Sequence, residues 1–269
     1  MKKYAFEYSG SQTFSGPVTR HDFLLRCIPV TCAFQRSYAH KLTVTPYTAL
    51  SRIMDVHGNA MYSGTVDKRH TSFTFRSSGF VLCSKYMLHE PLDRLYLYPT
   101  ALTRPIVQMA KVLESAPLSE DPWNRALQLC DLTHRSLKLT PRTSGERRTA
   151  AEVLASGHGD ARDQAHVLLA LLRSEGIPAR FVNGFAVGTD TVHCWVEVCC
   201  GDLWRALDPT TGEQALEGYL KVSQGPDYTS CALERGCFQE SDVTTRNELS
   251  VKVTQHVITA RDTSPHKAP

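Results

Sequence analysis

Helix signals are strongest between Asp160 and Pro178, and they constrain the fold more than any other part of the chain. Asp160 is a good N-cap residue, and Asp163 stands where the acid of a capping box stands. Gly176 fits the C-terminal cap, and Pro178 prevents the helix from continuing. One apolar stripe is formed by Ala165, Leu168, Leu169 and Leu172. The segment therefore predicts a single amphipathic helix with both ends defined.

Three candidate strands follow this helix, at residues 179–185, 192–200 and 203–208. Gly201-Asp202 supplies a tight hairpin turn between the last two, so those two strands should be antiparallel neighbours. Further upstream, residues 122–139 have the spacing of a helix with Trp123 on its apolar face. This part of the chain predicts helices packed on an antiparallel sheet.

The first 85 residues read as β structure, with short alternating segments separated by turn signals such as His57-Gly58-Asn59. Their regular spacing favours a sandwich, so the predicted fold class is α+β: an antiparallel β-sandwich-like domain followed by a helix-on-sheet core. We expect four parts, namely an N-terminal β domain, a proline-punctuated connector, the core and a disordered tail. These correspond to residues 1–85, 86–115, 116–258 and 259–269.

Charge and cysteine usage exclude several classes of function. The net charge of +3 over 269 residues, without a basic arm, gives no reason to expect a nucleic-acid partner. The segment Met1–Val18 lacks the uninterrupted apolar run of a secretory signal, so we expect a cytoplasmic protein with no membrane partner. The nine cysteines are scattered without Cys-x-x-Cys pairs, which predicts buried thiols and neither a metal site nor a cofactor.

Position 161 is the first residue of the predicted helix, and it is alanine. A cysteine at this position would feel unpaired backbone N–H groups and the positive end of the helix dipole, which favour the thiolate. The backbone N–H would also point toward the space where an oxyanion forms during acyl transfer. Ala161 keeps the helix and this N–H but supplies no nucleophile.

Two further residues complete a possible Cys-His-Asp arrangement. His193 lies in the strand over 192–200, and Asp208 ends the strand over 203–208, so the hairpin can bring them together. Because side chains alternate along a strand, Trp195 shares the face of His193, while Cys194 points to the opposite face and into the core. Cys194 is therefore not expected to replace the missing thiol.

The stretch from Arg148 to Tyr228 resembles the bacterial transglutaminase-like superfamily, whose pattern is Gly-x-Cys-Arg-Asp, His-Ala-Trp-Val-Glu-Val and Asp-Pro-Thr. The matching segments here are Gly159-Asp160-Ala161-Arg162-Asp163, His193-Cys194-Trp195-Val196-Glu197-Val198 and Asp208-Pro209-Thr210. The resemblance implies a papain-like thiol protease or amidase fold in which 161 is the nucleophile position, His193 the base and acid, and Asp208 the orienting carboxylate. The N-terminal β region resembles the accessory module of one bacterial branch.

By this resemblance the substrate is the amide bond of a peptide or protein, with Trp195, Asp160, Arg162 and Trp123 beside the cleft. Trp123 either donates to an oxyanion pocket, as an upstream Trp does in some relatives, or packs its helix. Ala161 is either an engineered replacement in a thiol enzyme or the native residue of a pseudoenzyme that binds a peptide or protein. A purely structural β-rich protein is the third alternative, and it requires His193 and Asp208 to lie apart.

Overall fold

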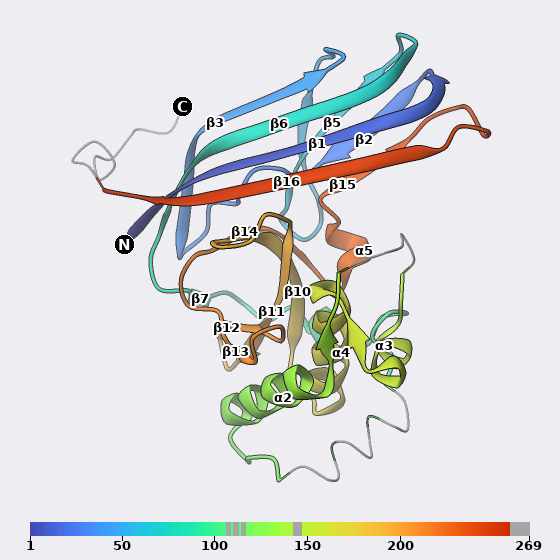
Figure 1. The fold of residues 1–269 in the computed structure, drawn as a ribbon. Helices are drawn as coiled ribbons and strands as arrows, with labels where there is room; N and C mark the ends of the chain where they lie inside the picture. The colour runs from blue at the N-terminus through green and yellow to red at the C-terminus, as the bar shows by residue number, and fades with distance from the viewer. Residues whose placement is uncertain (106–108, 110–112, 114–116, 142–146, 259–269) are drawn as a thin grey trace.

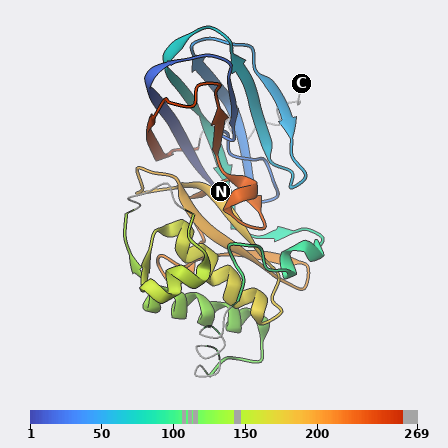
Figure 2. The same ribbon diagram turned by 90° about the vertical axis from the view of Figure 1, so that its right-hand side faces the viewer.

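The computed structural model describes residues 1–105, 109, 113, 117–141 and 147–258. A β-sandwich of two sheets lies above a unit in which helices pack on a separate six-stranded sheet (Figures 1 and 2). The fold class is α+β, with antiparallel pairing in all of the larger sheets, as the sequence predicts. The predicted tail over 259–269 lies outside the described residues.

Two four-stranded sheets form the sandwich. The first has the order β16-β1-β6-β3 and the second the order β15-β2-β5-β4. Their strands are β1 (Lys2–Val18), β2 (His21–Leu25), β3 (Gln35–Thr45), β4 (Ser51–Met54), β5 (Ala60–Val66), β6 (His70–Cys83), β15 (Glu234–Cys237) and β16 (Thr245–His256). The inward side chains of both sheets are mostly apolar and make one buried core, in which the rings of His21 and His70 are also packed.

The sandwich corrects the predicted domain division. Strands β15 and β16 were expected in the core over 116–258, but they pair with β2 and β1 of the sandwich. The core is therefore inserted between two parts of the sandwich: β1–β6 precede it in the chain, and β15 and β16 follow it (Figure 1). Alternation in a sequence predicts a strand and its faces but not a partner far away in the chain, which explains the difference.

The core sheet has the order β13-β12-β11-β10-β14, with β7 also paired to β12. Its strands are β7 (Leu88–His89), β10 (Ala179–Ala186), β11 (His193–Cys200), β12 (Leu203–Asp208), β13 (Glu213–Gln214) and β14 (Tyr219–Gly225). The predicted connector therefore contributes a strand to this sheet. It also contains the 3₁₀ helix η1 (Arg94–Leu97), and Tyr86 and Tyr96 from the same segment are buried.

Four described helices belong to this unit: α2 (Pro122–Ser136), α3 (Ala150–Ser156), α4 (Ala161–Ser174) and α5 (Tyr228–Cys231). The short strands β8 (Lys138–Leu139) and β9 (His158–Gly159) form a small parallel pair. Helix α4 begins at the predicted capping box, since Asp160 accepts from the Asp163 backbone N–H and Asp163 accepts from that of Asp160. Gly176 lies beyond its end with a φ of +68°, where a glycine is favoured.

Both faces of the core sheet are covered. The helices bury one face, where Cys194, Val196 and Val198 of β11 meet the apolar side of α4. The other face carries Trp195, packed with Tyr86 and other residues of the connector and the sandwich. The alternation predicted for β11 is thus correct.

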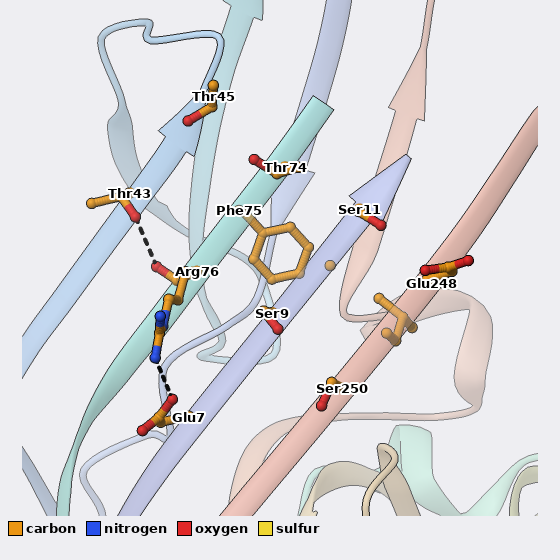
Figure 3. A pocket seen from close by; sticks show the side chains of 12 residues that line it. Glu7, Ser9, Ser11, Thr43, Thr45, Thr74, Phe75, Arg76, Glu248 and Ser250 are labelled. Carbon is orange, nitrogen blue, oxygen red and sulfur yellow. Dashed lines mark hydrogen bonds and ion pairs between the residues drawn. The ribbon is translucent and has the colours of Figure 1, made fainter. Parts of the chain in front are cut away.

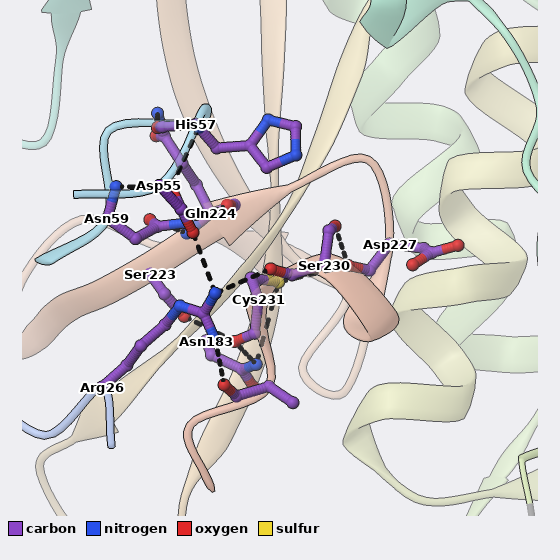
Figure 4. Close-up of polar contacts among 11 residues, drawn as sticks. Arg26, Asp55, His57, Asn59, Asn183, Ser223, Gln224, Asp227, Ser230 and Cys231 are labelled. Atoms are coloured by element: carbon purple, nitrogen blue, oxygen red, sulfur yellow. Dashed lines mark hydrogen bonds and ion pairs between the residues drawn. The ribbon is translucent and has the colours of Figure 1, made fainter. Parts of the chain in front are cut away.

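The sandwich and the core also share an apolar contact. Phe185 and Leu220 of the core sheet join the sandwich core, and the Phe185 ring lies 5.0 Å from that of Tyr8 between centroids. A polar contact lies beside it: the loop Asp55–Asn59 docks on β14 through two hydrogen bonds between Asn59 and the Gln224 backbone, of 2.8 and 2.7 Å (Figure 4). Buried Arg26 bonds Asp55 at 2.9 Å and the Ala232 carbonyl at 2.7 Å. The turn predicted at His57-Gly58-Asn59 therefore connects the sandwich to the core sheet through hydrogen bonds.

The outer face of the sheet β16-β1-β6-β3 is hollowed by a groove of about 630 Å³ (Figure 3). Short hydroxyl side chains such as Ser9, Ser11 and Thr74 line it, and the Glu7–Arg76 ion pair of 2.5 Å lies at its side. The groove belongs to the sandwich alone, so it is separate from the core sheet that carries the candidate site.

Candidate active site

The structure brings His193 and Asp208 into direct contact. His193 begins β11 and Asp208 ends the neighbouring strand β12, and the hairpin register places the two at the same end of the sheet. His193 Nε2 lies 2.6 Å from Asp208 Oδ2. A carboxylate only accepts hydrogen bonds, so in the neutral imidazole the proton lies on Nε2. Within the described residues no hydrogen bond reaches Nδ1, which is available to a reacting group.

Asp208 is held as an ionised carboxylate by four hydrogen bonds. Its Oδ1 accepts from the backbone N–H and the hydroxyl of Thr210, at 2.8 and 2.7 Å, and its Oδ2 accepts from His193 and from the Tyr219 hydroxyl, at 2.6 and 2.8 Å. Burial acts to raise the pKa of Asp208, but these hydrogen bonds outweigh it and lower the pKa. The charge that would stabilise an imidazolium at His193 is therefore present at neutral pH.

Contacts along α4 show which end of the sheet its N-terminus faces. Near the end of the helix, the Arg173 guanidinium donates to the Ala179 carbonyl at the start of β10, at 2.8 Å. Two turns earlier, the His166 ring packs on that of Phe181 with centroids 5.1 Å apart. The helix thus runs antiparallel to β10. From Arg173 back to Ala161 it spans about 18 Å, similar to the about 17 Å from Ala179 to Gly184.

Gly184 pairs with His193, so this direction places Ala161 at the His193 end of β11. Ala161 is half-buried and packs against the apolar cluster that contains Cys194, the residue after His193. The helix N-terminus and the two strand residues therefore lie at one end of the core unit. Cys194 itself is buried on the helix side, where its thiol donates to Asn183 Oδ1 at 3.0 Å.

Two predicted cleft residues have structural contacts of their own. Asp160 caps α4 through the Asp163 backbone N–H, at 2.9 Å. The Arg162 guanidinium stacks over the Tyr228 ring, 3.6 Å from its centroid. Both lie next to Ala161 in the chain, and both fix the first turn of α4 against its surroundings.

Trp195 and Trp123 do not form cleft walls, which corrects the sequence-based expectation. Trp195 is fully buried, and its indole N–H donates to the Tyr86 hydroxyl at 2.9 Å, so it lies beneath His193. Trp123 stacks with the Arg205 guanidinium, 3.5 Å from its ring centroid. Arg205 pairs with Val198, five residues along β11 from His193 and so about 16 Å away. Of its two predicted roles, packing of its helix is the one that this contact supports.

Sequence reasoning missed a buried ion cluster further along β11, on the same face as His193. Glu197 is fully buried; it contacts Arg180 Nε at 2.5 Å and Lys221 Nζ at 2.8 Å, and it accepts from the Tyr86 hydroxyl at 2.7 Å. Burial acts to raise the pKa of Glu197, but the charges of Arg180 and Lys221 prevail and lower it to about 2. The only signal in the sequence was the acid in the strand motif; its two basic partners lie on β10 and β14.

Tyr219 was also missed, because nothing in its local sequence links it to Asp208. It lies on β14, and its ring contacts both His193 and Trp195, with centroids 6.0 and 5.2 Å apart.

Among the described residues, no three His, Cys, Asp or Glu side chains are grouped as metal ligands. None of the described helices combines the length and apolar character needed to cross a bilayer.

Comparison with known proteins identifies the family of the chain. Residues 112–209 match the transglutaminase-like superfamily, and residues 4–81 match the bacterial transglutaminase-like N-terminal region. The chain belongs to the transglutaminase-like superfamily and carries the N-terminal region of its bacterial members. The resemblance inferred from the sequence motifs is therefore confirmed.

Similar proteins extend along most of the chain. An uncharacterized protein of Mycobacterium leprae is 26% identical over 255 residues, covering 86% of this chain and 91% of its own. An uncharacterized protein of Mycobacterium tuberculosis is 26% identical over 262 residues, covering 81% and 82%. The crystal structure of a "putative cysteine protease" from Cytophaga hutchinsonii has a TM-score of 0.82 at 17% identity, covering 96% of this chain and 92% of that one. At that identity the likeness shows the fold.

Proposed function

We propose that the end of the core sheet beside α4 is the site of a thiol enzyme acting on amide bonds, and that position 161 is its nucleophile position. The observation that carries the proposal is the contact between His193 and Asp208, at 2.6 Å, at the end of the sheet to which the α4 N-terminus points. The transglutaminase-like family and the fold shared with the "putative cysteine protease" of Cytophaga hutchinsonii support the same class. A purely structural role would need no such buried, hydrogen-bonded pair.

The chemistry follows from the positions of the groups. A thiol at 161 would give its proton to His193 Nδ1, and its sulfur would attack an amide carbonyl while the helix N–H groups face the oxyanion. The resulting imidazolium, stabilised by Asp208, would protonate the leaving amine and leave a thioester. Water would resolve the thioester in hydrolysis, or another amine in transamidation. With Ala161 the chain can hold the amide of a peptide or protein at this site but cannot form the thioester.

The alanine itself favours a second candidate function. A pseudoenzyme would keep the site for binding of a peptide or protein partner, and Ala161 removes only the sulfur while leaving the cap, His193 and Asp208 in place. The two candidates share one site and differ in whether a thiol belongs there. We expect no nucleic acid or membrane in either case and place the protein in the cytoplasm.

An Ala161→Cys variant tests the enzyme proposal with casein as the substrate. We expect cleavage of casein, or incorporation of a labelled primary amine into it, at a rate about 100-fold or more above that of the unchanged chain. Adding His193→Ala to the variant should abolish the gain. Absence of both products, in a variant whose new thiol reacts readily with iodoacetamide, would contradict an amide-bond enzyme and favour the binding candidate.

A further inference from the structure

Tyr219 contacts the candidate site from across the sheet. It lies on β14, whereas Asp208 lies on β12, and two strands, β11 and β10, separate them. Its hydroxyl nevertheless donates to Asp208 Oδ2 at 2.8 Å, on the same oxygen that accepts from His193. Thr210 donates from the turn that follows Asp208 and His193 from the neighbouring strand β11, so Tyr219 donates from the most distant strand.

On the intervening strand β10, the residue at this level of the sheet has no side chain. β10 carries Gly184 where it passes between His193 and Lys221, and a Cβ on Gly184 would lie 2.4 Å from the Trp195 ring. The indole fills the space that a side chain would occupy, and Tyr219 packs edge-on against it, with an interplanar angle of 78°. Trp195 is itself fixed by its bond to Tyr86. The Tyr219 hydroxyl is thus preorganised by buried groups.

We propose that Tyr219 is a positioning residue for the candidate site, acting through Asp208 to hold the His193 imidazole with Nδ1 toward position 161. The inference rests on the proposed function of the site. With Thr210 on Oδ1 and both His193 and Tyr219 on Oδ2, all four acceptor positions of the buried carboxylate are used. Removal of the Tyr219 hydroxyl leaves one acceptor position of Asp208 empty. Oδ2 then loses the hydrogen bond that holds it from the side of β14 and keeps only the bond from His193.

Tyr219→Phe separates the hydroxyl from the ring, which keeps its contacts with Trp195 and His193. In the unchanged chain, NMR should show a His193 Nε2–H that is bonded to Asp208 and exchanges slowly with water. We expect this proton to exchange about 10-fold faster in Tyr219→Phe, since the acceptor is no longer held. In the Ala161→Cys background, the same change should slow alkylation of the new thiol about 3–10-fold.

Tyr8→Phe is the matched control, because Tyr8 is fully buried and its hydroxyl also bonds a carboxylate, that of Glu234, in the sandwich. It should leave the His193 proton unchanged. Unchanged exchange in Tyr219→Phe, or equal acceleration in Tyr8→Phe, would overturn the positioning role. If the thiol at 161 is unreactive even with Tyr219 intact, the proposed function fails, while the exchange of the His193 proton still decides the role of Tyr219.

Discussion

Replacement of Glu197 by leucine should lower the free energy of unfolding by about 3–5 kcal/mol, the largest stability effect that we expect for a single substitution in the core sheet. Glu197 is fully buried, and it neutralises Lys221, which is also buried. Leucine would leave that ammonium without its counterion in a low-dielectric environment. Urea unfolding followed by tryptophan fluorescence measures the loss, because Trp195 lies on the same face of β11 as Glu197.

A double variant separates the ion pair from simple packing. Glu197→Leu with Lys221→Met removes both charges, and Arg180 keeps its other partner, Glu90, at 2.8 Å. We expect the double variant to be more stable than Glu197→Leu alone. Glu248→Leu is the control, since that side chain is 63% exposed and should change stability by less than about 0.5 kcal/mol. A loss below about 1 kcal/mol for Glu197→Leu would show that the cluster is dispensable.

The second large effect concerns the reactivity of a thiol placed at position 161. In Ala161→Cys at slightly acidic pH, iodoacetamide should alkylate the new thiol about 10-fold faster than an ordinary cysteine. The helix N-terminus and His193 raise the thiolate fraction there, although a more acidic thiol is also a weaker nucleophile. Mass spectrometry of the peptide that contains residue 161 follows the reaction.

Two controls make this rate interpretable. The unchanged chain contains the other nine cysteines and gives the background alkylation. Ala155→Cys places the same substitution at an exposed position in the last turn of α3, at the helix end whose dipole disfavours a thiolate. When His193→Ala is added to the Ala161→Cys variant, the alkylation rate of the thiol at position 161 should fall toward the rate measured for the Ala155→Cys control. Equal rates at the two positions would contradict a preorganised site.

Local signals in the sequence were sufficient where the structure depends on local geometry. The capping box at Asp160, the apolar stripe of α4 and the Gly201-Asp202 turn fixed one helix and one hairpin, and the structure has both. Because the hairpin is short, it also determined that His193 and Asp208 could meet. The alternation of β11 further assigned Cys194 to the helix face.

Features that depend on distant segments could not be predicted in the same way. From the sequence, Trp195 was expected beside the cleft. In the structure the connector buries it, and its indole N–H donates to the hydroxyl of Tyr86, a residue far away in the chain. The sequence of β16 predicts a strand, but it does not show that the partner of this strand is β1. Tyr219 of β14 bonds Asp208 of β12 across two strands, where Gly184 of β10 carries no side chain and the Trp195 ring takes up its space. In each case the deciding contact joins segments that no periodicity connects.

The convergence of the α4 N-terminus with His193 and Asp208 is most directly tested by the ionisation of a thiol at residue 161. The thiolate absorbs in the ultraviolet, so the difference in absorbance between Ala161→Cys and the unchanged chain, followed against pH, reports that one thiol. We expect a pKa below about 7 for it. A pKa at or above about 8.5, the value of a free cysteine, would contradict the convergence.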